Sequence, residues 1–333
     1  MPPLSRRERV FFMSQQPKPI RVVTIGGGTG QFTLLSALKT LPNIEATAIV
    51  SMADSGGSSG RLRDELGALP PGDVLKALLA LSELPEEVVR DLLLHRFSEG
   101  TLRDHNAGNM LLTMLAQYTE NFLTGVRGFS EILRVRGTVL PVTLGSITLR
   151  AELENGAVIV GETNIDVPKH DAALRIRRVW LEPNASALPE AIAAIREADC
   201  LFIGPGDLYT SILPVLLVHG IREAISETRA KKAYICNIMT KAGETHGFRA
   251  SDFVRVIEEC LRLTLDIVIC NTGTPLAKTL SRYEHESAAL VEPDLPGSRG
   301  ARNILGADLM SAGELARHDH KKLGALLKRA LQP

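Results

Sequence analysis

The sequence predicts an α/β fold in which a doubly wound, mostly parallel sheet carries a small inserted β-rich lobe. Short apolar runs rich in Val and Ile recur along the chain, and segments with helical periodicity lie between them. Each run ends in a polar or glycine-rich turn. Continuous apolar runs are typical of parallel strands that helices cover on both faces. Their alternation with helical segments therefore favours a doubly wound sheet.

Five runs are predicted to form the strands of this sheet: residues 21–25, 46–51, 200–203, 233–236 and 267–270. The predicted helices cover residues 32–41, 74–81, 86–97, 188–198 and 251–263. They follow or precede the strands as helices do in a sheet of this kind, where crossover connections join parallel strands.

The middle of the chain has a different pattern. Residues 134–180 alternate short apolar and polar stretches with turn residues, and Asn155-Gly156 separates two such stretches in the manner of a tight hairpin. We expect residues 134–180 to form a β-rich lobe within a single domain that spans residues 20–333. Residues 1–19 lack the long apolar stretch of a signal peptide, and we expect them to be a mobile leader.

Composition limits the classes of partner. The 333 residues include 38 Lys and Arg against 38 Asp and Glu, so the formal net charge is zero and no global field favours nucleic acid or an anionic membrane. No apolar run approaches the ~18 to 20 residues that span a bilayer. The 4 cysteines show no Cys-x-x-Cys spacing, which favours reduced thiols in a cytoplasmic protein.

The turns after the five predicted strands carry the main functional signal. They comprise residues 26–30, 54–60, 204–211, 237–240 and 271–273. Because the carboxyl ends of parallel strands share one edge of a sheet, these turns are expected to meet where ligands of such sheets bind. Glycine lets backbone N–H groups approach a phosphate, and the following helix adds its positive end. A ligand-free strand-to-helix turn remains the alternative for the first of them.

The candidate residues in the first half of the chain are Gly27, Gly28, Thr29, Gly30, Asp54, Gly57, Ser58, Ser59, Arg61, His105 and Asn109. Asp54 fits a ribose contact, a magnesium ligand or a helix cap. Gly57, Ser58 and Ser59 fit an anion nest, and Ser58 alternatively a hydrolase nucleophile. Arg61 fits a phosphate contact or a solvated helix start. His105 and Asn109 fit one helix face toward the crevice or a structural role.

An ordinary NAD site is not expected. The spacing begins as Gly26-x-Gly28, but Gln31 stands where the dinucleotide fingerprint has its third glycine. We see no hydride-transfer site that would support an NAD-binding oxidoreductase, which is therefore a minor alternative beside the serine hydrolase.

Six stretches carry a resemblance to a known family: IGGGTGQFTLLSALK, AIVSMADSGGSSGRLRDELGALPPGD, HNAGNMLL, RVRGTVLPVT, GPGDLYTSILPVLLVHGI and YICNIMTKAGETHGF. On these stretches the chain resembles the gluconeogenesis factor family. The resemblance implies a Rossmann-like core, binding of uridine-diphosphate sugars, and a role in cell shape and carbon metabolism. It also implies similarity in fold to the 2-phospho-lactate transferases, which need magnesium.

The resemblance adds site residues in the second half of the chain: Gly204, Gly206, Tyr209, Thr210, Ser211, Asn237 and Thr240. It also shows two departures. Ser55 stands where relatives usually have a second Asp, which bears on magnesium binding, and Val74-Leu75-Lys76 stands where they have Ile-Arg-Asn. The sequence thus predicts a regulatory protein that binds a nucleotide sugar, with a phospho-lactyl-type transferase as the alternative. Self-association into a homo-oligomer stays open.

Overall fold

The computed structural model describes residues 18–295 and 302–332, so most of the predicted leader, residues 1–17, lies outside the described part. The main sheet has seven strands in the order β10-β9-β8-β7-β1-β2-β3, and every pair is parallel. These strands are β1 (Ile20–Gly26), β2 (Ile44–Val50), β3 (Thr138–Pro141), β7 (Cys200–Ile203), β8 (Lys231–Ile235), β9 (Ile267–Asn271) and β10 (Asn303–Ala307). The predicted doubly wound parallel sheet is confirmed.

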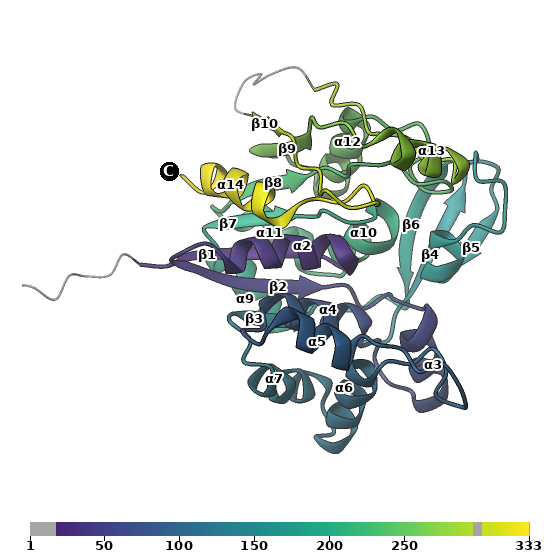
Figure 1. The fold of residues 1–333 in the computed structure, drawn as a ribbon, viewed down its shortest axis with the longest axis vertical. Helices are drawn as coiled ribbons and strands as arrows, with labels where there is room; N and C mark the ends of the chain where they lie inside the picture. Colours follow the sequence, from purple (N-terminus) through teal and green to yellow (C-terminus); the bar gives the residue numbers. More distant parts are fainter. Residues whose placement is uncertain (1–17, 296–301, 333) are drawn as a thin grey trace, which may run out of the picture.

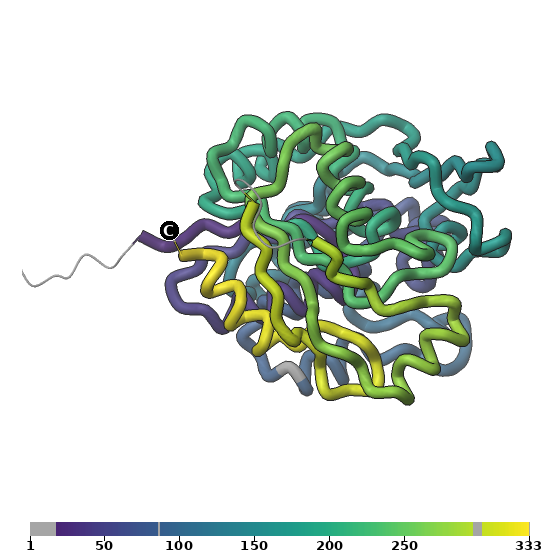
Figure 2. The backbone as a smooth tube through the Cα atoms, turned by 90° about the horizontal axis from the view of Figure 1, so that it is seen from above, coloured from purple at the N-terminus to yellow at the C-terminus, as the bar shows by residue number. Residues whose placement is uncertain are grey.

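Helices cover both faces of the sheet, as Figures 1 and 2 show. On one face lie α2 (Gly28–Lys39), α4 (Gly72–Leu81) and α14 (His320–Ala330). On the other lie α9 (Pro189–Glu197), α10 (Leu213–Leu216), α11 (Ile221–Glu227) and α12 (Ala250–Leu261). Neighbouring strand residues serve opposite faces: Val22 packs in the cluster that includes α2 and α14, whereas Val23 belongs to the cluster that includes α9 and α12. This alternation explains why the strands are apolar throughout.

The remaining helices extend the domain at its lower end in Figure 1 or connect strands. They are α3 (Gly57–Leu66), α5 (Glu86–Leu93), α6 (Ala107–Tyr118), α7 (Phe122–Ile132), α8 (Glu162–Asp166) and α13 (Ala277–His285). Within the described residues, no helix combines the length and apolar character needed to cross a membrane.

The inserted lobe is a three-stranded antiparallel sheet, β5-β4-β6. It consists of β4 (Thr148–Leu153), β5 (Val158–Val160) and β6 (Ile176–Glu182), and the predicted Asn155-Gly156 turn joins β4 to β5. Its limits differ from the predicted 134–180. The segment Thr138–Pro141 pairs with β2 in the main sheet, and the lobe runs on to Glu182. Short edge strands such as β3 carry too few residues to show which sheet they join.

Gln31 explains how α2 packs without the third glycine of the dinucleotide fingerprint. Its side chain is buried, and its amide nitrogen donates to Thr24 Oγ1 at 3.1 Å and to the Ile49 carbonyl at 3.3 Å. The helix is therefore fixed to β1 and β2 by amide hydrogen bonds instead of by close backbone contact.

The order of the strands reverses between β1 and β7, and the loops after these two strands touch there. A Cβ atom at position 30 would lie 2.2 Å from the Pro205 carbonyl oxygen and 2.9 Å from the Gly206 nitrogen. Both are backbone atoms, so no side chain can move to make room.

Gly30→Ala is therefore expected to destabilise the protein by about 1–3 kcal/mol, the usual cost of overpacking. The control is Gly128→Ala in α7, where an added Cβ meets nothing within 4 Å and should stabilise by about 0.4–1 kcal/mol. Urea unfolding of both variants measures the difference. Equal stability of the two would show that the loops after β1 and β7 are not packed as described.

Candidate functional site

Loops after three neighbouring strands line one cleft at this reversal of strand order. The cleft has a volume of about 550 Å³, and its walls come from the loops after β1, β7 and β8, from the end of α8 and from the segment before α14. Five predicted site residues line it: Thr29, Gly30, Gly206, Asn237 and Thr240. We call this the main cleft. It lies at the edge where ligands of doubly wound sheets bind.

A smaller cavity of about 220 Å³ adjoins the main cleft, and we call it the acidic recess. Thr29, Asp166 and Asp207 line both cavities. Four further predicted residues face the recess: Gly28, Asp54, Thr210 and Ser211. The rest of its lining consists of Asp73, Lys76 and Glu162. The turns after β1, β2, β7 and β8 therefore meet, as the sequence predicted, whereas the turn at residues 271–273 lines neither cavity. The recess is also far more acidic than the turns alone indicated.

Asp73 places negative charge directly against the glycine loop. A Cβ atom at Gly27 would lie 2.3 Å from Asp73 Oδ2, so only glycine leaves room for this carboxylate. Lys76, one turn later on α4, donates to Asp73 Oδ1 at 3.1 Å, and Asp73 raises the pKa of Lys76. Burial and the nearby Asp73 raise the pKa of Asp54.

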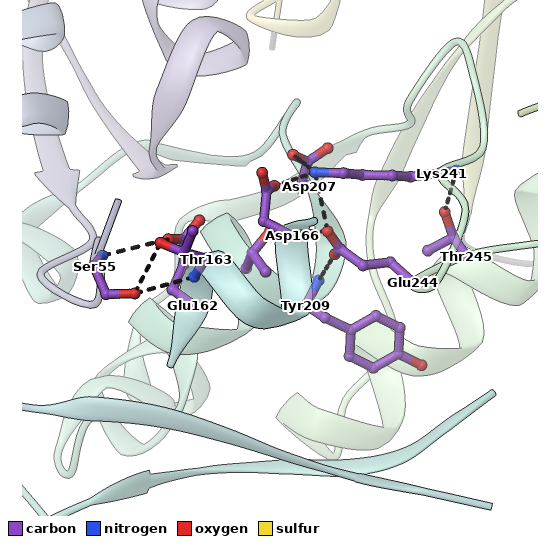
Figure 3. A network of polar contacts seen from close by, with 10 residues as sticks. Ser55, Glu162, Thr163, Asp166, Asp207, Tyr209, Lys241, Glu244 and Thr245 are labelled. Carbon is purple, nitrogen blue, oxygen red and sulfur yellow. Dashed lines mark hydrogen bonds and ion pairs between the residues drawn. The ribbon is translucent and has the colours of Figure 1, made fainter. Parts of the chain in front are cut away.

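Ser55, which follows Asp54 of the recess directly in the sequence, holds the lobe against the recess. Its hydroxyl accepts from the Thr163 backbone N–H at 3.0 Å and contacts Thr163 Oγ1 at 3.1 Å, and its backbone N–H donates to Glu162 Oε2 at 3.3 Å (Figure 3). Ser55 has no carboxylate of its own, but its backbone N–H helps to hold the Glu162 carboxylate in the recess. Burial raises the pKa of Glu162 to about 7, with Asp54 and Asp166 adding to the effect.

A lysine that lines the main cleft is surrounded by three carboxylates (Figure 3). Lys241 Nζ lies 2.8 Å from Asp207 Oδ2 and 3.2 Å from Glu244 Oε1, and it also contacts Asp166 Oδ1. Burial acts to lower the pKa of Lys241, but the carboxylates, Glu244 first, raise it, so the lysine stays charged. Burial, together with Asp207, raises the pKa of Glu244 to about 8.

Glu244 also fixes the loop after β7. It is buried, and it accepts from the Tyr209 backbone N–H at 3.3 Å and from the Thr210 hydroxyl at 3.1 Å. Those residues belong to a single π-helical turn, Leu208–Ile212, a geometry frequent at functional sites. The Tyr209 ring points away from the carboxylates, as Figure 3 shows, and lines a different pocket. Tyr209, which the resemblance gave as a site residue, therefore lines neither the main cleft nor the acidic recess.

Two side-chain atoms of the main cleft lack partners. Asn237 Oδ1 and His318 Nε2 are both buried from solvent, and neither forms a hydrogen bond with any described residue. Burial lowers the pKa of His318 to about 4, so the imidazole is neutral at physiological pH. Buried polar atoms without a hydrogen bond are costly, so two residues of this lining carry an unsatisfied polar atom.

Nine predicted residues lie outside both cavities: Gly27, Gly57, Ser58, Ser59, Arg61, His105, Asn109, Gly204 and Tyr209. Arg61 donates to the carbonyl oxygens of Thr101 and Arg103 and so anchors a loop. Ser58 Oγ and His105 Nδ1 lie 2.8 Å apart, and both side chains are almost fully buried. Gly204 packs beside Gly26 where the loops of β1 and β7 meet.

Sequence reasoning missed most of the charged side chains of the site. Asp207 and Lys241 lie within or next to the turns that it singled out, and the polarity of those turns was an available signal. Glu162 and Asp166 belong to the lobe, for which the sequence predicted only structure. Glu244 lies three residues beyond Lys241 in a stretch without strand or helix, where periodicity gives no information.

The raised pKa of Glu162 predicts how the stability of the folded protein depends on pH. The ordinary value is 4.5, so between about pH 4.5 and 7 the folded protein holds a proton that the unfolded chain releases. The free energy of unfolding therefore falls as the pH rises through this window. Glu162→Gln should be more stable than wild type at pH 8 by roughly 1–3 kcal/mol and equal to it at pH 4.

Urea unfolding without divalent cations, at both pH values, measures this difference. Glu154→Gln, at an exposed position of the hairpin, is the control and should match wild type throughout. A Glu162→Gln variant that is no more stable at pH 8 would contradict the described burial of this carboxylate.

Comparison with known proteins agrees with the fold and with the resemblance of the sequence. The family model of 2-phospho-L-lactate transferase CofD matches residues 22–311. The gluconeogenesis factor of Bacillus subtilis is 42% identical over 320 residues, which are 95% of this chain and 98% of that protein. The gluconeogenesis factor of Halalkalibacterium halodurans is 43% identical over 312 residues, covering 92% and 95%.

A solved structure shows the same architecture. The crystal structure of a member of the UPF0052 family from Bacillus halodurans superposes with a TM-score of 0.86 at 40% identity, covering 94% of this chain and all of that one. The chain therefore belongs to the gluconeogenesis factor family, within the wider group that the CofD family model describes.

Proposed function

We propose that this protein binds a uridine-diphosphate sugar in the main cleft and has a regulatory role in the cytoplasm, linked to cell shape and carbon metabolism. The observation that carries the proposal is a cavity of about 550 Å³ whose lining includes Asn237 and His318, each of which has a buried side-chain atom, Oδ1 and Nε2, without a hydrogen-bond partner. That volume lies within the range of about 300–1,000 Å³ for small-molecule sites. A uracil or sugar ring carries the donors and acceptors that these two atoms lack.

The diphosphate would lie at the start of α2. The residue before the helix is Gly27, which has no side chain to cap it, so the first N–H groups, those of Gly28, Thr29 and Gly30, are free to bind an anion. Thr29 lines both cavities, and its hydroxyl adds a donor at their junction.

The acidic recess beside this position requires a cation. A diphosphate next to Asp54, Asp73 and Glu162 would meet like charge, which a divalent metal would neutralise. These side chains offer oxygen donors only, the set that Mg²⁺ prefers. We therefore propose Asp54, Asp73 and Glu162 as magnesium ligands, with Glu162 supplying the carboxylate that Ser55 lacks. Held by these residues, the metal would supply the positive charge that offsets the diphosphate.

Binding of UDP-glucose, measured by calorimetry with Mg²⁺ present, tests the site. Asn237→Ala should bind about tenfold more weakly, since losing one buried hydrogen bond costs on the order of 1–2 kcal/mol. Asn155→Ala, in the exposed hairpin turn, is the matched control and should bind as wild type does. Wild-type affinity in Asn237→Ala would remove the main cleft as the binding site.

The role of the metal has its own test. Without Mg²⁺, or with EDTA, affinity for UDP-glucose should fall by at least about tenfold, because several carboxylates then face the diphosphate unscreened. In Asp54→Asn the dependence on Mg²⁺ should weaken while the folded structure persists. An affinity for UDP-glucose that is the same with and without Mg²⁺ would exclude the proposed role of the metal, but it would not exclude the main cleft as the binding site.

The CofD family match favours a second candidate, a phospho-lactyl-type transferase. The same metal and the carboxylates of the recess would then stabilise charge on the transferred phosphoryl group. Turnover of a guanosine-activated lactyl phosphate donor with a deazaflavin acceptor tests this candidate. Absence of product with an active transferase as positive control would leave binding alone.

For the serine hydrolase alternative, the structure places a histidine beside the candidate nucleophile but leaves that nucleophile inaccessible to a substrate. His105 lies within hydrogen-bond distance of Ser58, yet Ser58 is only 2% exposed and lines neither cavity. A fluorophosphonate should leave the folded protein unlabelled, and labelling of Ser58 would revive the hydrolase.

A further inference from the structure

A second cavity, separate from the main cleft and the acidic recess, has the opposite charge. It has a volume of about 390 Å³ and lies between β6, the π-helical turn with α10, and α12. We call it the rear pocket. Five arginines line it, and Glu259 is the single acidic residue of its lining: Arg175, Arg177, Arg178, Arg222 and Arg255. A cavity with this lining attracts anions even though the whole chain is neutral.

Three of these arginines are already paired. Arg177 and Arg178 bind Glu152 at 3.1 and 2.8 Å, and hydrogen bonds from Arg178 and Arg177 lower the pKa of that carboxyl. Arg178 also stacks on Trp180, 5.0 Å from the ring centre. Arg255 contacts Asp252 and Glu259.

Arg175 and Arg222 are different. Within residues 18–295 and 302–332, neither guanidinium forms an ion pair or a hydrogen bond, although both line the rear pocket from separate elements. Two unpaired guanidinium groups around one cavity can hold two negative charges in the bidentate geometry that arginine favours.

The floor of the rear pocket is apolar. It includes Leu213, Leu217 and the Phe248 ring, which an edge-on contact with Phe253, 5.5 Å between ring centres, holds in place. Tyr209 adds a phenol whose proton is retained, since burial raises its pKa to about 12. An occupant that matches this lining has an apolar or aromatic ring and anionic groups at its rim.

We infer that the rear pocket binds an organic dianion, an aromatic or apolar ring that carries phosphate or carboxylate groups, through Arg175 and Arg222. The pocket shares no lining residue with the main cleft or the acidic recess. The rear pocket and the acidic recess share the π-helical turn, because Tyr209 lines the rear pocket while the next two residues, Thr210 and Ser211, line the recess. An occupant that shifts the Tyr209 ring acts on the turn that Glu244 holds.

Titration with 8-anilinonaphthalene-1-sulfonate, a fluorescent anion with apolar rings, tests the pocket on the intact protein. Arg175→Gln/Arg222→Gln should bind this probe about tenfold more weakly, as expected for the loss of two charge-assisted contacts. Arg127→Gln/Arg329→Gln removes two exposed arginines from α7 and α14 and is the matched control, expected to bind as wild type does. Emission of Trp180, the chain's one tryptophan, should change on binding in wild type because Arg178 stacks on it.

Competition identifies the anionic group. Displacement of the probe by phenyl phosphate points to a phosphate ester, and displacement by phthalate points to a dicarboxylate. Equal affinity of the probe for the two double variants, or failure of both competitors to displace it, would overturn the inference. The proposed function is separately testable, since Arg175→Gln/Arg222→Gln should retain binding of UDP-glucose in the main cleft.

Discussion

The functional edge of this molecule depends on the backbone contact between the loops after β1 and β7. These are the two central strands between which the order of the sheet reverses, and glycine at positions 27 and 30 lets backbone and carboxylate approach where a Cβ would collide. The start of α2 and the π-helical turn thereby reach the same cavity walls. If the two loops lay at the same edge of the sheet without contact, each would form a separate shallow turn and there would be no single cleft.

Charge is divided sharply over this edge. The acidic recess gathers carboxylates from α4, α8 and the loops after β2 and β7. Lys241, which lines the main cleft, contacts two of them, Asp166 and Asp207, and also the buried Glu244. Few of these carboxylates are close neighbours in the sequence. The fold tolerates each of them because burial raises its pKa or because a charged lysine lies beside it. The rear pocket collects arginines on β6, α11 and α12 together with Arg175, which directly precedes β6. A chain with zero net charge thus contains two cavities of opposite sign.

The sequence was sufficient for the parts of the fold that local pattern encodes. The five predicted strands match β1, β2, β7, β8 and β9, because strands buried on both faces need unbroken apolar runs. The sequence did not predict β10, because its Asn303–Ala307 segment is an edge strand that contains a polar residue and a glycine. It also did not show that β3 belongs to the main sheet. Site prediction from the glycine turns that end strands gave cavity-lining residues such as Gly28, Gly30 and Gly206, but also Gly27, Gly57 and Gly204, which line neither cavity. It failed where tertiary folding decides, as for Arg61, which binds carbonyl oxygens about forty residues away along the chain.

The cover of β1 by α14 has a consequence for how the protein is made. Leu323, Leu326 and Leu327 pack with Val22 and Leu34, and β1 pairs on its far edge with β7, so that Arg21 and Asp199, 178 residues apart, are bonded. Among the described strands, β1 is synthesised before the others but is enclosed only after α14 has been made. Contacts of such long range slow folding and leave an apolar surface exposed meanwhile. The apolar side chains of β1 therefore stay uncovered until α14 has emerged.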